Sequence, residues 1–321
     1  MPIRSDFPNG FLNGVTLRGM PIVQAHPGEV FWLYNGTALL GQQRGGSDGN
    51  KGTFNSPFST LAGAQAKCVA NRGDIIMVKP GHAETISSST ALTMSIAGVA
   101  VIGLGNGTNR PKFTLDTAAT AAINVSAANV SFQNCQFFAN FLAITSCFTL
   151  TTAAEFTVQG CYFRDTTSVL NFLNIVRSTG AANTVDGLTF NDNVVVNLGV
   201  TSNNTTILTA NDIDRLTVQR NYLRWAVQND KAIGVIVSAG VLTNALVTDN
   251  WGYRPNTTTA GGSLITVGGT TSSGIVARNL VQTLTTVTDL LFTTTVGLAA
   301  FDNRVTGVVG ASGFLIPAAD S

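Results

Sequence analysis

The chain is poor in charged side chains, and this shortage narrows the classes of protein to which it can belong. Asp, Glu, Lys and Arg make up 11% of its 321 residues, and the formal net charge is +1. An ordinary soluble domain is about 25% charged. Long-range attraction to nucleic acid or to anionic membranes is therefore excluded, and neither partner is expected. The surface must consist largely of Thr, Ser, Asn, Gly and small apolar groups, so we expect part of it to be buried in a larger assembly.

We also expect neither an export signal, nor a membrane span, nor a disulfide framework. The first ten residues, MPIRSDFPNG, lack the apolar stretch of a secretion signal, and no apolar run approaches about 18 residues. The longest such stretch, 94–104, is broken by glycine and is predicted as a buried strand. The four cysteines are too few for a disulfide scaffold, so free thiols in a reducing cytoplasm are expected.

A repeat of alternating apolar and polar residues runs through most of the chain. Seven segments align, at 130–138, 156–164, 188–196, 216–224, 246–253, 275–282 and 300–306. One aligned position is held by Cys135, Cys161, Asn193, Asn221, Asn250, Asn279 and Asn303, an average step of 28 residues. The alternation is that of β-strands. An earlier segment, 99–107, fits the pattern with glycine in place of asparagine.

A second strand is expected ahead of each aligned segment. These strands fall at 121–125, 147–150, 171–176, 205–210, 232–237, 263–267 and 289–294. Each repeat is then a strand, a turn, a strand, a sharp bend, a further strand and a loop. The pattern predicts an all-β fold, a right-handed single-stranded parallel β-helix. An α-helical solenoid is excluded because leucine-rich helical periodicity is absent and Thr and Val abound.

The recurring asparagine has a physical reason. A sharp bend often needs one residue near the left-handed region, which Gly and Asn tolerate best. Asparagine side chains can also hydrogen-bond to the same position one coil above and below, since coils lie about 4.8 Å apart. We therefore predict a structural ladder of Asn193, Asn221, Asn250, Asn279 and Asn303 at this bend.

Both ends of such a solenoid expose strand edges and need caps. Residues 59–70 are predicted as a short capping helix with Ser59 or Thr60 as its N-cap, followed by a buried strand and turn at 73–81. Residues 1–45, with one strand at 30–35, are expected to lie outside the repeat. The predicted β-helix spans 46–310, and residues 311–321 are expected to cover the last coil.

Residues 45–86 resemble the N-terminal module of pectate-lyase-like β-helix proteins, which are frequent in bacteriophage and prophage genomes. The features that match are a Gly/Asp/Asn loop, Pro57-Phe58, a short helix, Gly73-Asp74, and Lys79-Pro80-Gly81 followed by Glu84. With the coils, the resemblance covers roughly residues 45–310. Members of this superfamily include polysaccharide lyases and hydrolases, tailspikes and non-catalytic virion proteins, so the resemblance implies a fold and a phage origin but not an activity.

The carboxylates that are the best candidates for catalysis are also those best placed to have a structural role. The residue before the aligned asparagine is Asp192, Arg220, Asp249, Arg278 and Asp302 in successive coils. Each carboxylate should have an arginine one strand spacing away, which favours its ionised form and makes it a poor general acid. We therefore predict a structural charge ladder and no catalytic residue.

Other chemistry-bearing residues form no convincing site. Asp212 and Asp214, and Asp48 with Asn50, offer too few ligands for calcium. The only histidines are His26 and His82, too few for zinc, and we expect His82 to be a surface residue or to make a local hydrogen bond. Cys135 and Cys161 should be stacked, partly buried thiols, with a disulfide as the alternative. No metal and no cofactor are predicted.

Aromatic residues follow the bend in several coils. Tyr222, Trp225, Trp251 and Tyr253 are candidates for contact with a carbohydrate or with another subunit. Sugar stacking would suit a tailspike, and packing beneath a loop or at a subunit contact is the favoured alternative.

Together these observations predict a non-enzymatic bacteriophage virion protein, either a capsid decoration (cement) protein or a short spike, assembled in the host cytoplasm. By analogy with similar phage proteins we expect a homotrimer that contacts other virion proteins, the major capsid protein or tail and vertex proteins, with residues 1–45 docking on the virion. The main alternative is a tailspike-type adhesin that binds, and in one version cleaves, a bacterial surface polysaccharide. A weaker alternative is a cellular pectate-lyase-like enzyme.

Overall fold

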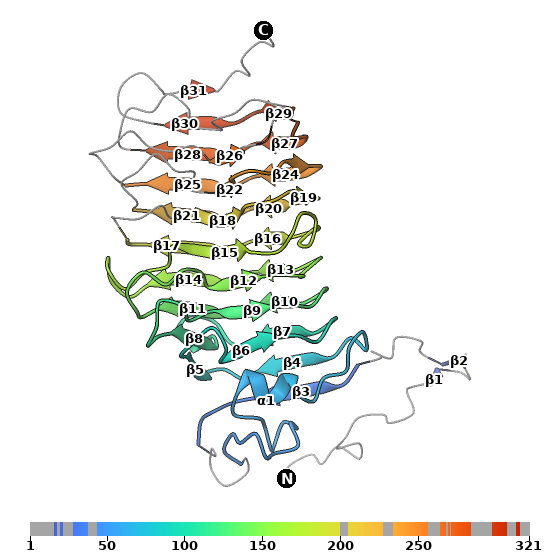
Figure 1. Cartoon of the computed structure of the whole chain (residues 1–321). Helices are drawn as coiled ribbons and strands as arrows, with labels where there is room; N and C mark the ends of the chain where they lie inside the picture. The colour runs from blue at the N-terminus through green and yellow to red at the C-terminus, as the bar shows by residue number, and fades with distance from the viewer. Residues whose placement is uncertain are drawn as a thin grey trace.

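The computed structural model shows a right-handed parallel β-helix, as the repeat predicts (Figure 1). It describes residues 28–37, 44–199, 205–226, 234–255, 264–267, 269, 271–283 and 297–306, together with strand residues 16–17, 20–21 and 313–314. Three parallel sheets run along the solenoid, and each of the seven coils between β6 and β28 contributes one strand to each sheet in the predicted order. Within the described part of the chain, no helix is long and apolar enough to cross a membrane.

The first strand of each coil lies in a seven-stranded sheet, here called sheet 1. Its strands are β6 (Leu92–Met94), β9 (Ile123–Val125), β12 (Phe148–Leu150), β15 (Asn174–Ser178), β18 (Thr205–Thr209), β22 (Val235–Val237) and β26 (Ile265–Val267). The further strand predicted at 289–294 lies outside the described residues.

The second strand of each coil lies in a ten-stranded sheet, sheet 2, which ends at the bend. Its strands are β3 (Val30–Leu33), β4 (Ile75–Val78), β7 (Ala100–Gly103), β10 (Ser131–Gln133), β13 (Thr157–Gln159), β16 (Thr189–Asn191), β20 (Thr217–Gln219), β24 (Ala245–Thr248), β27 (Gly274–Ala277) and β29 (Leu298–Phe301). The single strand predicted across 94–104 is wrong, because a turn separates β6 from β7 there.

The third strand of each coil follows the bend and lies in sheet 3. Its strands are β5 (Ala83–Ile86), β8 (Lys112–Leu115), β11 (Gln136–Ala139), β14 (Tyr162–Asp165), β17 (Val194–Asn197), β21 (Tyr222–Trp225), β25 (Trp251–Arg254), β28 (Leu280–Thr283), β30 (Arg304–Thr306) and the antiparallel β31 (Gly313–Phe314). Short elements outside the three sheets are β1 (Thr16–Leu17), β2 (Met20–Pro21), η1 (Gly107–Asn109), β19 (Ile213–Asp214) and β23 (Leu242–Thr243).

The core is a column of side chains that point inward from all three sheets. In its lower half this column is aromatic: Phe137 stacks on Phe113 at 5.6 Å and on Phe163 at 5.0 Å between ring centroids. Phe148 of sheet 1 meets Phe137 edge to face at 5.1 Å. Ring contacts of this kind stabilise a structure beyond the apolar area that they bury, so these coils should be the most rigid part of the solenoid.

The asparagine ladder lies buried at the bend between sheets 2 and 3, where each of its five members is 1–2% exposed. Each Oδ1 accepts a hydrogen bond from the backbone N–H of the aligned residue in the preceding coil, at 2.8 to 3.0 Å. Each Nδ2 donates to a carbonyl of sheet 2 in that same coil, at 2.7 to 3.0 Å. The ladder therefore satisfies backbone groups that the bend would otherwise leave unpaired in the core.

The prediction that the asparagine itself adopts the left-handed conformation is wrong. Positive φ angles occur one residue earlier, at the charge-ladder positions: 59° at Asp192, 52° at Arg220, 60° at Asp249, 53° at Arg278 and 53° at Asp302. The left-handed residue turns the chain and exposes its own side chain, and the asparagine that follows points inward. Arginine gains no local hydrogen bond from this conformation, which costs roughly 1–2 kcal/mol.

The N-terminal cap is shorter than predicted. Helix α1 (Leu61–Gln65) begins after the N-cap Thr60, whose side chain accepts from the Gly63 N–H at 3.0 Å. It ends at Gln65 rather than at residue 70, because the N–H groups of Lys67 and Cys68 bond to carbonyls three residues back and the Val69 N–H bonds to Asp74. Leu61 remains fully buried, so the short helix still covers core side chains.

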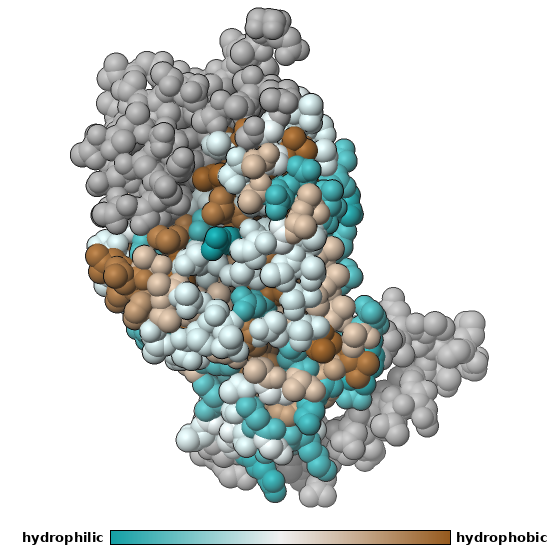
Figure 2. Space-filling view, in the orientation of Figure 1, coloured by the Kyte–Doolittle hydropathy of each residue, from teal (hydrophilic) through white to brown (hydrophobic). Residues whose placement is uncertain are grey.

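The boundary predicted at residue 45 lies too late in the chain. Strand β3 pairs in parallel with β4, Val30 with Ile75 and Leu33 with Val78, and is therefore the first strand of sheet 2 rather than part of a segment outside the repeat. At the other end, β31 extends sheet 3 by pairing antiparallel with β30. The visible face of the solenoid is mostly of intermediate hydropathy (Figure 2), as expected for a surface rich in Thr, Ser and Gly.

Candidate binding site

Two strands of sheet 3, β21 and β25, point aromatic and basic side chains outward. They follow the ladder residues Asn221 and Asn250. Tyr222 and Arg224 face outward from β21, and they pair in register with Trp251 and Tyr253 of β25. The rings of Tyr222 and Trp251 meet edge to face, with centroids 5.0 Å apart at 84°. These four residues, Tyr222, Arg224, Trp251 and Tyr253, are called the aromatic patch below.

Trp225, predicted as a fourth aromatic contact, cannot take part. It is fully buried, and its Nε1 donates to Thr206 Oγ1 at 3.0 Å. Successive strand residues point to opposite faces, so a residue three positions after Tyr222 must point inward. The same alternation places Arg224 on the outer face beside Tyr222. Arg224 is not among the predicted contacts, although the alternation in the pattern YLRW indicates its position.

The aromatic patch carries groups that can bind a carbohydrate or pack against another subunit. Trp251 is 46% exposed, so an apolar ring face can reach the solvent. The Arg224 guanidinium donates through Nη1 to the Asn197 carbonyl at 3.3 Å, which holds it against the sheet, and it carries further N–H donors. Aromatic rings offer a platform for the apolar face of a sugar, and a positioned arginine can bind hydroxyl or carboxylate oxygens.

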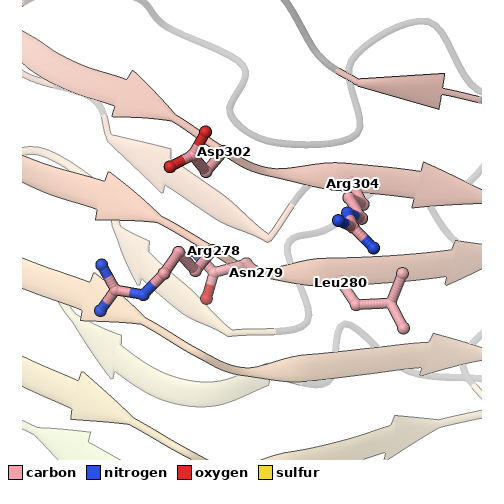
Figure 3. Close-up of a pocket in the computed structure, with 5 residues that line it drawn as sticks. All are labelled: Arg278, Asn279, Leu280, Asp302 and Arg304. Carbon is pink, nitrogen blue, oxygen red and sulfur yellow. The ribbon is translucent and has the colours of Figure 1, made fainter.

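A hollow of about 590 Å³ lies one coil beyond the patch and is lined by Arg278, Asn279, Leu280, Asp302 and Arg304. Figure 3 shows Arg304 and Leu280 on neighbouring strands, with Asp302 and Arg278 on the other side of the hollow. The register Trp251–Leu280–Arg304 makes the hollow continuous with the outer face of the patch. An extended ligand could therefore contact three coils at once.

The predicted charge ladder forms separate pairs rather than a continuous chain of bridges. Arg220 binds Asp192 through two contacts, 2.7 Å from Nε to Oδ1 and 2.9 Å from Nη2 to Oδ2. Arg278 binds Asp249 in the same way, at 2.7 and 2.8 Å. Each arginine reaches back to the preceding coil, and no ion pair joins Arg220 to Asp249 among the described residues.

The pairing makes these carboxylates unsuitable as proton donors. The hydrogen bonds from Arg220 lower the pKa of Asp192, and those from Arg278 lower the pKa of Asp249. Both groups are therefore ionised at neutral pH, whereas a general acid must hold a proton there. Both also occupy left-handed bend positions, so their geometry is part of the scaffold.

The carboxylates weighed as calcium ligands serve as turn supports. Asp214 accepts from the side chains of Asn244 and Thr243, and Asp212 accepts from the Val241 N–H. Asp48 accepts from the backbone and hydroxyl groups of the two residues before α1 and so anchors the start of that helix. Among the described residues, no group of three or more His, Cys, Asp and Glu could hold a metal ion.

His82 is buried rather than on the surface, and it makes the local hydrogen bonds that were the other expectation. Its Nδ1 accepts from the Asn35 N–H at 3.2 Å, so Nε2 carries the proton and donates to Glu84 at 3.1 Å. Glu84 in turn accepts from the Leu61 N–H at the start of α1. The chain of contacts links β3, β5 and the capping helix.

One carboxylate that the sequence did not single out has an altered pKa. Asp165 at the end of β14 is 1% exposed, and burial raises its pKa to about 7 against the lowering effect of three backbone donors. Those donors are the N–H groups of Phe172, Leu198 and Gly199. Because Asp165 is enclosed by the loops that it ties together, it is a structural support.

All four cysteines are free and buried. Cys135 and Cys161 occupy the ladder phase in adjacent coils, and the Cys161 N–H donates to Asn193 at 2.8 Å. They are fully rather than partly buried, and no disulfide joins them. Desolvation raises the pKa of both thiols, to about 12 for Cys161, so neither is a nucleophile at neutral pH.

Comparison with known proteins gives likeness of fold alone. No known family and no curated protein matches the sequence. Among solved structures, a rhamnogalacturonan lyase aligns over 90% of each chain with 14% identity and a TM-score of 0.41. The pectate lyase Pel9A aligns over 86% of this chain and 79% of its own, with 10% identity and a TM-score of 0.39. Likeness at this level assigns no activity.

Proposed function

We propose that this chain is a non-enzymatic structural protein of a bacteriophage virion, a capsid decoration protein or a short spike. The observation that supports this most directly is the state of the carboxylates stacked along the bend. The ionised carboxylates of Asp192 and Asp249 are each paired with an arginine, with 2.7 Å between the arginine Nε and the carboxylate Oδ1. A polysaccharide hydrolase needs a carboxylic acid and a carboxylate free to act on a substrate between them, and these two residues offer neither.

The rigid β-helix suits such a role. Its backbone hydrogen bonds are made between coils, and the buried asparagine ladder ties each coil to the next. The resemblance of residues 45–86 to phage β-helix proteins supplies the link to a virion. In this proposal the protein is a homotrimer, residues upstream of β3 dock on the capsid or on tail and vertex proteins, and assembly takes place in the host cytoplasm.

Quantitative mass spectrometry of purified particles, from the phage or induced prophage whose genome encodes the chain, tests this proposal. We expect the protein in the particles, with hundreds of copies for a capsid decoration protein and a few to tens for a spike. Its absence from particles that contain the major capsid protein would overturn the virion role. Limited proteolysis of intact particles then shows which end is protected.

A second candidate function is that of an adhesin for a bacterial surface polysaccharide, and the aromatic patch favours it. Binding of purified host polysaccharide is measured by calorimetry, and cleavage by a reducing-sugar assay. We expect Trp251→Ala to weaken binding at least tenfold. The matched control is Leu142→Ala, which removes another exposed apolar side chain, 58% exposed, on a loop away from the patch. Equal binding by the wild type and Trp251→Ala would exclude this site.

A further inference from the structure

None of the strand side chains on the outer face of sheet 2 carries a formal charge, although the Lys79 ammonium lies over the ring of Trp32 on the first strand, 5.7 Å from the ring centroid. Each of the ten strands contributes two outward side chains, all among the described residues; eighteen of the twenty are at least partly exposed, and Thr248 and Ala277 are buried. They are Val30, Trp32, Ile75, Met77, Ala100, Ile102, Ser131, Gln133, Thr157, Gln159, Thr189, Asn191, Thr217, Gln219, Leu246, Thr248, Ile275, Ala277, Ala299 and Phe301. An ordinary exposed surface is about 25–35% Lys, Arg, Glu and Asp.

The shortage of charge in the whole chain does not explain this face. Sheet 3 points Lys112, Arg164, Arg224 and Arg304 outward from strands of the same solenoid. Charged residues are thus accommodated on one outer face and missing from another. Depletion of charge at the centre of a surface is the compositional mark of a protein–protein interface.

The apolar residues of this face gather at its two ends. Val30 and Phe301, 46% and 42% exposed, stand on its first and last strands, and Ile275 on the penultimate strand is 41% exposed. The four strands in the middle, β10, β13, β16 and β20, carry only hydroxyl and amide side chains outward. The face is thus apolar at both ends and polar in the middle. A second copy can therefore pack its apolar ends on apolar ends and its polar middle on the polar middle in either a parallel or an antiparallel orientation.

The polar middle has many of its hydrogen bonds satisfied within the sheet. Asn191 Oδ1 accepts from the Gln219 N–H at 3.0 Å, and Gln219 Nε2 donates to Thr248 Oγ1 at 3.0 Å. Gln159 Nε2 donates to Asp192 at 3.3 Å. Burial of a polar group is costly mainly when it leaves that group without a partner, so these amides can be covered by another molecule at little cost.

Charged pairs border the face on both sides. The bend carries the Asp192–Arg220 and Asp249–Arg278 pairs. The turns that lead into sheet 2 carry Arg215, which binds Glu155 at 2.8 Å and Asp214 at 3.2 Å. A charge-free centre with a polar rim is the usual anatomy of an interface between proteins.

We propose that the outer face of sheet 2 is a self-association surface that binds a second copy of this chain. A partner with a strongly charged surface would leave its charges buried opposite neutral side chains, whereas a second copy meets apolar ends with apolar ends and hydroxyl and amide groups with their like. Ten strands about 4.8 Å apart and about four residues long give a face of roughly 600 Å². The two charged rims bring this near the roughly 800 Å² per partner of a standard interface.

The surface is tested by placing a charge at its centre. Thr157 on β13 is half-buried and lies in the middle of the sheet, so it stays central whichever way two copies face. Thr157→Lys should weaken self-association at least tenfold in sedimentation equilibrium, because each contact then buries an unpaired charge or opposes like charges. The control is Thr149→Lys, which adds the same charge to a half-buried threonine of β12 on the outer face of sheet 1.

A mixture of two oppositely charged variants distinguishes a loss of association from a folding defect. Thr157→Lys mixed with Thr157→Glu should restore association, while each alone stays dissociated and keeps the thermal transition of the wild type. A wild-type chain that remains monomeric throughout the tested concentrations overturns the proposal, and so does an associated Thr157→Lys variant. The inference holds for a virion protein and for an adhesin alike. A monomeric wild type would also contradict the homotrimer of the proposed virion protein, whereas an associated Thr157→Lys variant would overturn this surface alone.

Discussion

Replacement of Asn250 by alanine tests the asparagine ladder at its centre. The Oδ1 of Asn250 accepts from the Asn221 backbone N–H at 3.0 Å and from Asn221 Nδ2 at 2.9 Å. Its Nδ2 donates to the Val218 carbonyl at 2.8 Å and to Asn279 Oδ1 at 3.0 Å. Asn279 Oδ1 keeps a second donor, the Asn250 N–H. Truncation therefore removes a bonding partner from three buried groups: the Asn221 N–H, one Asn221 amide proton and the Val218 carbonyl.

The expected loss of stability follows from that count. A buried polar group that loses its partner costs about 1–3 kcal/mol. Asn221 Nδ2 keeps its hydrogen bond to the Phe190 carbonyl, so the cost for this group should lie at the low end of that range. We expect a total of about 3–6 kcal/mol for Asn250→Ala, which would place it among the most destabilising single substitutions.

Two measurements check this expectation. Chemical denaturation gives the change in the free energy of unfolding, and hydrogen exchange detected by mass spectrometry reports protection of the Asn221 N–H, because a solenoid can open locally. The control is Asn106→Ala: Asn106 is exposed and its side chain makes no capping bond. A loss below about 1 kcal/mol for Asn250→Ala, with unchanged protection of Asn221, would refute the reasoning, since it would mean that the ladder bonds are replaced without cost.

Three further predictions concern carboxylates. Asp165→Asn turns an amide toward the N–H groups of 198–199 and should cost about 2–4 kcal/mol in chemical denaturation at acidic pH, where the contribution of Asp165 is fullest. Burial raises the pKa of Asp165 to about 7, whereas the pKa of an unfolded aspartate is near 3.8. The stabilisation of the fold by Asp165 is therefore fullest below pH 3.8 and is lost as the pH rises toward 7. The Asn variant should lack this pH dependence. Arg220→Gln should raise the pKa of Asp192, followed by NMR titration, and leave stability almost unchanged because the pair is exposed. Asp48→Ala should cost about 1–2 kcal/mol and loosen the capping helix, seen as faster hydrogen exchange at its first turn.

The repeat was predictable because each coil solves the same problem with the same residues. Alternation gave the strands of all three sheets, and the recurring asparagine gave the bend. The residue that holds the left-handed conformation was misplaced by one position, because Asn and Gly favour that region by propensity while the structure needs the amide inside. Burial of the ladder amide outweighed the cost of a left-handed Arg220 and Arg278.

Candidate site residues were harder to place because their environment depends on neighbouring coils. The aromatic spacing suggested four contacts, but alternation buries Trp225 and exposes Arg224. Asp165 gave no signal, since its three backbone donors come from loops 7 to 34 residues away. The strand at 30–33 cannot be assigned to the repeat from the sequence, because the loop and capping helix that follow it interrupt the regular step.

The asparagine ladder also governs how this molecule can change its length. Steps between consecutive ladder residues are 28, 29, 29 and 24 positions, yet the hydrogen bonds that join them have nearly the same length. The spacing of the ladder along the axis is therefore kept although the number of residues between its members varies. Gain or loss of a whole coil would leave every internal ladder contact intact. Evolution can thus adjust the reach of the protein in increments of about 4.8 Å, without redesigning its core.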